Sequence, residues 1–336
     1  MNERVYRPSG PLRWLLKHCR PSREWSVLAC VGTEQRSVAA YSEMRLSGNV
    51  AHTAMLRIAD KHSRFNSAIE TCLHERLGEF ASAGGNVSDI IDARLFNSHA
   101  EIVTIIDEFI RDSNGSILLD ITSLPKRFFF PFIRRILTSA ASSSIRDFIV
   151  TYTPPASYTK EPLAEDFNLW SQLPLFGGEY VATTPKMLVI AAGFESLGLQ
   201  EQLKGESDLP VKLLLPFPAP PSAFQRSWET IRKLRQQRSH EAFEVFRASA
   251  KDCADTFDRL VSLTDRNTQR AQLAPFGPKP MSLGMCLFAV RTNSEVFYTQ
   301  PAVYNPYYSI GVAMRNGSVD VQAFAVRLEG VDLYEI

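Results

Sequence analysis

The loop 120–126 (DITSLPK) places an acid, two hydroxyls and a lysine together at the end of an apolar run. Asp120 ends the run, Thr122 and Ser123 follow, and a proline suits the first turn of a helix that Lys126 would begin. Helix N-terminal amides, hydroxyl donors and an ammonium group together favour binding of an anion. The same residues also fit simple helix capping, with Thr122 or Ser123 accepting from backbone amides and Lys126 solvated.

Side chains of similar chemistry follow other apolar runs of the chain. Glu34 and Glu195 each stand two residues after a glycine, Lys279 lies in the loop GPKP, and Tyr152 and Tyr298 end apolar runs. In open parallel sheets, ligands bind beyond the carboxyl ends of the strands. We therefore expect these five residues to contact a ligand, together with those of loop 120–126.

The two glutamates leave more than one interpretation open. Glu34 and Glu195 could do acid–base work or hold a metal. Either could instead cap the next helix or pair with a nearby arginine, such as Arg36. The sequence contains no GxSxG, GxGxxG or HExxH motif, and its five cysteines have no metal-site spacing, so we expect no catalytic residue, metal or cofactor.

Apolar runs alternate with helical patterns, as they do in βαβ units. The runs VLACVG, NVSDIID, SILLDIT and DFIVTYT form a first series, and MLVIAAG, VKLLLPF, EVFYTQP and the C-terminal tail form a second. Composition predicts helices within 37–80 and over 224–249. The sequence thus predicts an α/β fold with mostly parallel sheets flanked by helices.

Three landmarks recur in the same order in both series. They are Gly-x-Glu (32–34 and 193–195), Pro-Lys (125–126 and 278–279) and Tyr-Thr-x-Pro (152–155 and 298–301). We interpret them as an internal duplication, although chance matches in a chain with 17 Gly and 20 Pro are the alternative. The predicted organisation has four parts: a basic, aromatic arm over 1–25, a Rossmann-like half over 26–155, a linker over 156–186, and a second half over 187–336.

The order Asp-x-Thr-Ser-x-x-Lys between a strand and a helix resembles the ligand loop of the CARF and SAVED sensor domains of bacterial antiviral systems. The resemblance rests on Asp120, Thr122, Ser123 and Lys126, and the chain departs from the family pattern by having Ser-Leu-Pro in place of glycines. It implies a loop facing cyclic oligonucleotide phosphates across a pseudo-two-fold axis, and a regulatory or defence role. Two halves in one chain are more similar to SAVED than to a CARF dimer.

The net charge, one basic segment and the cysteines limit the kinds of partner and location that the sequence predicts. The net charge of +1 argues against wholesale wrapping of nucleic acid. The basic segment 226–238 could contact a phosphate backbone, or it could be a solvated amphipathic face with Trp228, Ile231 and Leu234 inward. Cys30 and Cys286 lie in apolar runs and are expected in the core, and the chain reads as cytoplasmic, without a signal peptide or membrane span.

The sequence leaves three functions open. The first is a sensor or accessory protein of a defence system that binds a nucleotide or other phosphorylated ligand between the two halves and relays it to a protein partner or another copy. The second is an enzyme acting on a nucleotide or nucleic acid phosphate, with Asp120, Lys126 and Glu34 or Glu195. The third is a scaffold without a ligand. Two lysine-bearing loops favour the first, and we expect no enzymatic turnover.

Overall fold

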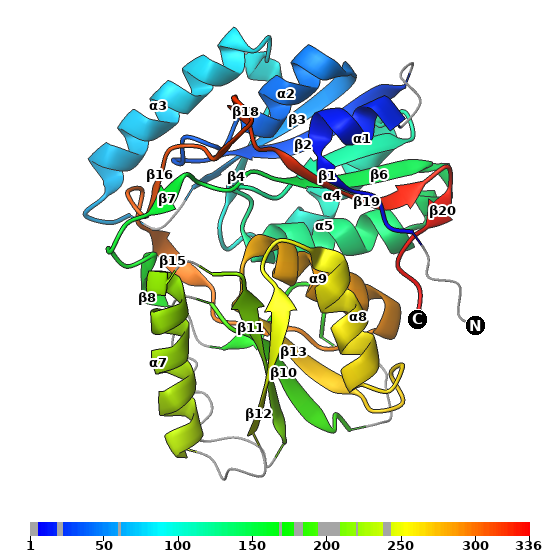
Figure 1. Cartoon of the computed structure of the whole chain (residues 1–336). Helices are drawn as coiled ribbons and strands as arrows, with labels where there is room; N and C mark the ends of the chain where they lie inside the picture. The colour runs from blue at the N-terminus through cyan, green and yellow to red at the C-terminus, as the bar shows by residue number, and fades with distance from the viewer. Residues whose placement is uncertain are drawn as a thin grey trace. The chain divides into compact units, whose positions relative to one another are not determined.

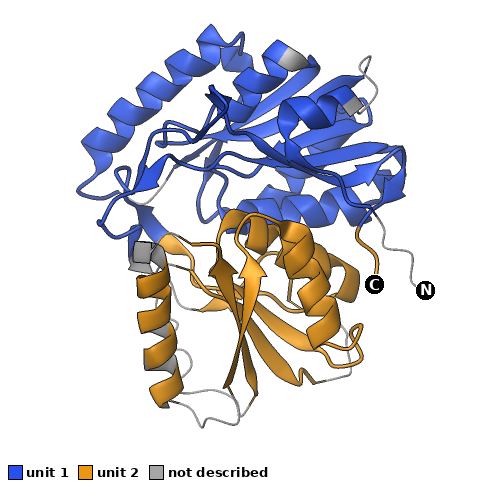
Figure 2. Ribbon diagram, in the orientation of Figure 1, with its two compact units in different colours: residues 1–165, 302–333 blue, residues 166–301, 334–336 orange. Residues whose placement is uncertain are grey.

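The computed structural model describes residues 6–18, 23–59, 62–167, 170–177, 184–193, 209–219, 221–237 and 243–336. The chain divides into two compact units, coloured in Figure 2. Unit 1 comprises residues 1–165 and 302–333, and unit 2 comprises residues 166–301 and 334–336.

Unit 1 is built on a mixed sheet with the strand order β1-β19-β6-β5-β2-β3-β4, in which β20 pairs with β19. Its strands are β1 (Ser9–Pro11), β2 (Glu24–Val31), β3 (Asn49–Ala59), β4 (Ile90–Arg94), β5 (Ser116–Asp120), β6 (Asp147–Tyr152), β19 (Gln322–Leu328) and β20 (Val331–Asp332). Strands β6, β5, β2, β3 and β4 are parallel, whereas β19 is antiparallel to β6, and β1 is antiparallel to β19. Ranked along the chain, the parallel strands lie in the order 3-2-1-4-5, the order of the Rossmann fold.

The helices of unit 1 cover both faces of this sheet. Figure 1 shows α2 and α3 on one face and α4 and α5 on the other. The helices are α1 (Leu12–His18), α2 (Ala39–Ser47), α3 (Asn66–Ser82), α4 (His99–Asp112) and α5 (Lys126–Thr138). With both faces covered, β5 and β6 are buried along their whole length, which explains why they read as continuous apolar runs.

One part of unit 1 differs from the sequence prediction. The segment 37–80 was predicted to be helical, but its middle, 49–59, is strand β3. Pairing with β2 and β4 on both sides outweighs the modest helix preference of its alanine, methionine and leucine residues. The C-terminal strand β19 also joins unit 1, antiparallel to β6, although the sequence placed it in the second half.

Unit 2 contains a fully parallel sheet with the order β12-β11-β10-β13. Its main elements are β10 (Met187–Ala191), β11 (Val211–Phe217), α7 (Pro221–Gln237), β12 (Phe243–Ser249), α8 (Cys253–Leu263), β13 (Ala271–Pro275) and α9 (Lys279–Thr292). Ranked along the chain, the strands lie in the order 3-2-1-4, and Val296 forms a parallel bridge to Leu273 of β13. The shorter β9 (Ser171–Gln172) pairs with β14 (Phe297–Tyr298).

One prediction fails in unit 2, and one strand was not predicted. The helix predicted over 224–249 ends at Gln237 in the described residues, and 243–249 is strand β12. Strand β13, just before the GPKP loop, had no prediction. Both strands are short and acquire their conformation by pairing with β11 and β10.

The predicted α/β class with mostly parallel sheets flanked by helices is confirmed. Both units also share the strand order 3-2-1-4, but common topology does not establish common ancestry, and the internal duplication stays a prediction. Cys30 and Cys286 are buried, as expected. Of the helices in the described ranges, none has the length and apolar character needed to cross a bilayer.

Candidate functional site

The order of the parallel strands in unit 1 reverses between β2 and β5, so the loops after these strands flank a topological switch point. The two loops lie in contact: a Cβ atom added to Gly32 would lie 3.0 Å from the Cβ of Ser123. Only glycine leaves room for this approach without displacing its neighbour. Ligands of open α/β sheets bind at such a point, which makes this edge the candidate site.

Asp120 is the centre of a buried hydrogen-bond network at this edge. Its Oδ1 atom accepts from the Thr122 hydroxyl at 2.6 Å, from the Thr151 hydroxyl at 3.0 Å and from the Thr122 amide at 3.3 Å. The Thr122 hydroxyl in turn accepts from the amide of Thr153 at 2.9 Å, which links the ends of β5 and β6. The three bonds to Asp120 all reach Oδ1, and Oδ2 has no hydrogen-bond partner.

Burial raises the pKa of Asp120 to about 6, while hydrogen bonds from Thr122 and Thr151 and the charge of Arg36 oppose the rise. The side chain is 1% exposed. At neutral pH, the fold therefore holds an ionised carboxylate at a cost in stability. Groups kept in this way are concentrated at functional sites.

Three polar atoms at the same edge are buried and have no hydrogen-bond partner. They are Asp120 Oδ2, Ser123 Oγ and Thr153 Oγ1. A buried polar atom left without a partner costs about 1–3 kcal/mol, so such atoms are uncommon in native proteins. Their grouping where β2, β5 and β6 end is the pattern expected of a site that a polar ligand completes.

Lys126 is the first residue of α5 and is only 8% exposed, in contrast to the solvated lysine that the capping interpretation required. The N-cap residue is Pro125, and no side chain caps the helix. Thr122 and Ser123 therefore do not act as helix caps, because Thr122 serves Asp120 and the Ser123 hydroxyl has no partner. The capping interpretation of this loop is wrong.

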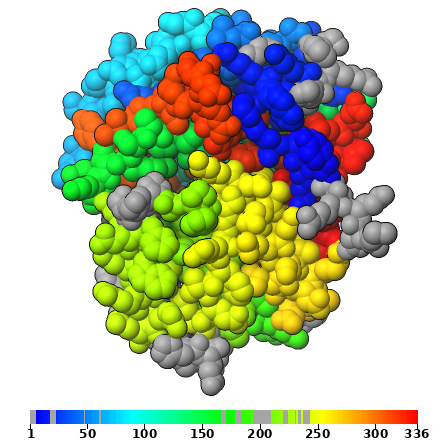
Figure 3. All heavy atoms as spheres, viewed as in Figure 1, coloured from blue at the N-terminus to red at the C-terminus, as the bar shows by residue number. Residues whose placement is uncertain are grey.

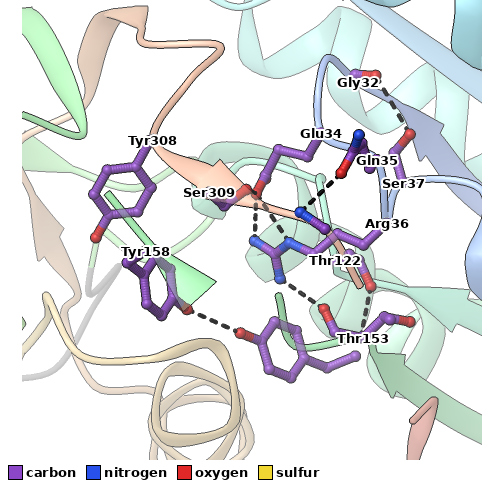
Figure 4. A network of polar contacts seen from close by, with 12 residues as sticks. Gly32, Glu34, Gln35, Arg36, Ser37, Thr122, Thr153, Tyr158, Tyr308 and Ser309 are labelled. Atoms are coloured by element: carbon purple, nitrogen blue, oxygen red, sulfur yellow. Dashed lines mark hydrogen bonds and ion pairs between the residues drawn. The ribbon is translucent and has the colours of Figure 1, made fainter. Parts of the chain in front are cut away.

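Arg36 and Glu34 form an ion pair beside this network (Figure 4). Arg36 Nε and Nη2 donate to Glu34 Oε2 at 2.9 and 2.7 Å, and Nη1 donates to the Thr153 carbonyl at 2.6 Å. Burial disfavours the guanidinium charge, but Glu34 and two tyrosines outweigh it and raise the Arg36 pKa above its ordinary value. The alternative that Glu34 pairs with Arg36 is thus confirmed.

The residues Glu34 and Gln35 also hold a distant segment of the chain. The Ser309 hydroxyl donates to Glu34 Oε2, and the amide of Gly311 donates to Gln35 Oε1 at 2.8 Å. Figure 4 shows the Ser309 segment meeting the loop after β2. The loop at the switch point is therefore tied to residues 309–311.

Three tyrosines extend the contacts of Arg36 towards residues 309–311. The Arg36 guanidinium lies over the Tyr152 ring, 5.4 Å from its centroid, and the Tyr152 hydroxyl is 3.5 Å from that of Tyr158. Tyr158 packs against Tyr308 with ring centroids 5.2 Å apart. Tyr152 thus belongs to the network of loop 34–36, while its contact with a ligand stays a prediction.

Unit 2 holds the other predicted site residues. Lys279 begins α9 after Pro278 and is half-buried. Tyr298 is 4% exposed, and burial raises the pKa of its hydroxyl. The next residue, Thr299, has a buried hydroxyl without a partner. Glu195 lies outside the described residues.

Sequence reasoning missed several members of the unit 1 network. Thr151 sits within an apolar strand and Ser309 lies far along the chain, so neither had a local signal. Arg36 was considered only as a partner of Glu34, although a basic residue two positions from that acid was a usable signal. Across the described ranges, no group of three or more His, Cys, Asp or Glu side chains could hold a metal ion.

No protein-family model and no curated protein matches this chain. Among solved structures, it is similar to a type III CRISPR defence DNA nuclease activated by cyclic oligoadenylate, with a TM-score of 0.48 and 8% identity over 82% of this chain. The match spans 65% of that nuclease, less than two thirds of its length.

Two further structures show weaker similarity. A functionally unknown protein from Pseudomonas aeruginosa PAO1 has a TM-score of 0.23 and 13% identity over 82% of this chain and 92% of its own. The N-domain of bacterial malonyl-CoA reductase with NADP has a TM-score of 0.21 and 10% identity over 82% and 79%. None of these similarities is strong enough to assign an activity to this chain.

Proposed function

We propose that unit 1 binds a nucleotide-type ligand at the switch point between β2 and β5, and that the protein is a sensor rather than an enzyme. The observation that carries the proposal is Asp120, a buried carboxylate whose Oδ2 atom has no partner. Retaining such a group costs stability, and natural proteins usually accept that cost where function requires it.

The polar groups at this edge suit a ligand with both donors and negative charge. Asp120 Oδ2 can accept a hydrogen bond from a sugar hydroxyl or an exocyclic amine, and the Ser123 and Thr153 hydroxyls can donate or accept. Lys126 and the N-terminus of α5 favour phosphate. A nucleotide combines these features, whereas inorganic phosphate alone would leave Asp120 without a donor.

The contacts of loop 34–36 provide a route by which binding could be relayed. Residues 309–311, held by Glu34 and Gln35, lead into the hairpin of β17 (Met314–Arg315) and β18 (Ser318–Val319). This hairpin, Gln35 and parts of α2 and α3 line a groove of about 1040 Å³ in unit 1. A ligand that competes with Glu34 for Arg36 would weaken the Glu34 contact with Ser309 and shift this wall of the groove.

The biological setting of this proposal rests on the sequence resemblance of loop 120–126 to CARF and SAVED sensors. On that basis, the protein is a cytoplasmic accessory component of a bacterial defence system, with a protein partner or a second copy as the recipient of the signal. That the ligand lies between the two units also belongs to the resemblance and stays a prediction.

Thermal unfolding of the full chain with a panel of probes tests the proposal. The probes are inorganic phosphate, AMP, ATP, NADP and cyclic oligoadenylates. A probe at 100 times its Kd should stabilise the protein by about 2.7 kcal/mol. At the same probe concentration, the stabilisation should be clearly smaller in Asp120→Asn and Lys126→Ala. A full response in both variants, or no response to any nucleotide, would contradict the proposal.

One observation favours the enzyme alternative. A buried carboxylate with a pKa of about 6 can exchange a proton near neutral pH, as a general base does. Incubating the chain with Mg²⁺ or Mn²⁺ and nucleotides, RNA or DNA distinguishes the two functions. Product formation that disappears in Asp120→Asn, Glu34→Gln or Glu195→Gln would make this protein an enzyme.

A further inference from the structure

The helix α7 of unit 2 exposes two aromatic side chains in a regular arrangement. Phe224 is 39% exposed and Trp228 is 46% exposed. Their rings are parallel to within 5°, with centroids 6.3 Å apart. Large aromatic side chains that remain exposed in this way commonly mark a binding surface. The alternative in which Trp228 points inward is therefore wrong, although Ile231, placed inward by the same alternative, is buried.

A different face of α7 packs against the rest of unit 2. Ile231 is 0% exposed, and the Ser227 hydroxyl donates to the carbonyl of Gly193 at the end of β10, at 3.0 Å. Phe224 and Trp228 lie four residues apart and so share one side of the helix. Because that side is exposed, it is available for a partner.

The same helix is strongly basic. It carries Arg226, Arg232, Lys233 and Arg235 against a single acid, Glu229, whereas the whole chain has 37 basic and 36 acidic residues. The exposed Arg232 follows Trp228 by four residues, so the aromatic pair continues into positive charge along one side of the helix. Figure 3 shows atoms of this helix, in yellow-green, on the surface of unit 2.

We propose that this stripe of Phe224, Trp228 and Arg232 binds single-stranded nucleic acid. Bases stack on the two aromatic rings, and phosphates contact the arginines of the C-terminal half of the helix. In a duplex, the base faces are stacked on one another, so they cannot stack on the two aromatic rings. Positive charge beside aromatic platforms is the combination that single-strand binding proteins use. This site is separate from the ligand site proposed in unit 1.

Fluorescence anisotropy of the full-length protein with labelled oligo(dT), oligo(U) and a DNA duplex tests this inference. The single strands should bind more tightly than the duplex. Trp228→Ala and Phe224→Ala should each weaken single-strand binding about fivefold to a hundredfold. Arg232→Ala should lower the slope of log affinity against log salt by about 0.7, the contribution of one phosphate.

Two matched variants keep the result interpretable. Trp14→Ala removes a tryptophan that is 42% exposed on α1 of unit 1 and should leave single-strand binding unchanged. Lys126→Ala should also bind oligo(dT) like the wild type, so failure of the nucleotide site would not affect this test.

The inference is overturned if Phe224→Ala and Trp228→Ala bind single strands like the wild type, or if the duplex binds as tightly. It is also overturned if light scattering shows self-association that depends on Trp228 while oligo(dT) does not compete, because the stripe would then be a protein interface.

Discussion

The two units place a lysine at the start of a helix in the same way but surround it with different chemistry. In each unit, the fourth strand of the order 3-2-1-4 leads through a proline to the helix: β5 to Lys126 and β13 to Lys279. The last residue of β5 is Asp120, whereas the last residue of β13 is Pro275. The carboxylate that organises the edge of unit 1 has no counterpart at that position.

The surroundings of the two helices reinforce the contrast. In unit 1, the loop after β5 contributes hydroxyls and a carboxylate to a polar network. In unit 2, Gly277 lies close to Ala191 and to the carbonyl of Ala192, and α9 is buried along most of its length. One topology thus supports a polar, costly edge in unit 1, whereas the loop at the start of α9 in the described part of unit 2 packs against alanine residues. This is why we place the ligand chemistry in unit 1.

The largest expected effect tests the packing role of α9. A Cβ atom at Gly284 would lie 2.4 Å from the carbonyl oxygen of Cys253 and 2.8 Å from the Cβ of Thr256, both on α8. Gly284→Val should therefore force the two helices apart and lower the free energy of unfolding by about 3 kcal/mol or more. Urea denaturation measures the change.

Gly78→Ala is the matched control, because a Cβ atom at Gly78 in α3 meets nothing within 4 Å. Alanine there should raise stability by about 0.5–1 kcal/mol, the usual gain over glycine within a helix. A tolerated Gly284→Val would show that α9 is not the packed element described above.

The next effect concerns the burial of Asp120, whose pKa rises from 3.8 to about 6. Asn resembles the protonated acid, so Asp120→Asn should raise the free energy of unfolding by about 2–3 kcal/mol at pH 7. Below about pH 4, both folded and unfolded carboxyls are protonated and the gap should close. The wild type should lose this stability as pH rises from about 4 to 6, where the unfolded chain ionises first.

Asp147→Asn provides the opposite case in the same sheet. Asp147 is also 1% exposed, but it is paired with Arg23 and accepts from the amide of Glu329 at 2.9 Å. Its substitution should destabilise the protein at pH 7, because Arg23 loses a buried partner. Urea titrations of both variants across this pH range measure the two changes in the free energy of unfolding. Destabilisation by Asp120→Asn at pH 7 would refute the functional interpretation of Asp120.

A smaller effect distinguishes the two lysines. Lys126→Ala should weaken binding of a responsive nucleotide about tenfold to a hundredfold, the range for loss of a charge-assisted hydrogen bond. Lys279→Ala should leave the same affinity unchanged, since the strand before its helix ends in Pro275, where β5 ends in Asp120. Calorimetric titration measures both. Equal losses would show that the units contribute alike and would restore the symmetric site that the sequence repeat predicts.

The smallest effect uses two threonines, Thr153 after β6 in unit 1 and Thr299 after β14 in unit 2. Thr153 and Thr299 both have buried hydroxyls without a partner. Replacing either with Val removes that hydroxyl at nearly constant volume and should stabilise the protein by about 1 kcal/mol. Only Thr153→Val should reduce nucleotide binding. A reduction in Thr299→Val instead would move the ligand to unit 2.

The sequence by itself determined the elements whose signals are local. Strands β5 and β10 read as continuous apolar runs because both of their faces are covered. Helix α4 has a strong apolar period and a capping box formed by Ser98 and Glu101. The position of Lys126 at a strand-to-helix junction followed from the proline before it. These features depend only on neighbours within a few residues.

Only the tertiary structure decided the strands and contacts that depend on distant partners. β3 and β12 are strands because they pair with β2 and β11, and the local sequence of each gives no clear preference for strand over helix. Thr151 reaches Asp120 from the next strand, and Ser309 reaches Glu34 from far along the chain. Sheet pairing brings such residues together over long sequence separations, so no spacing in the sequence marks them, and the unpartnered oxygen of Asp120 became visible only after its neighbours were in place.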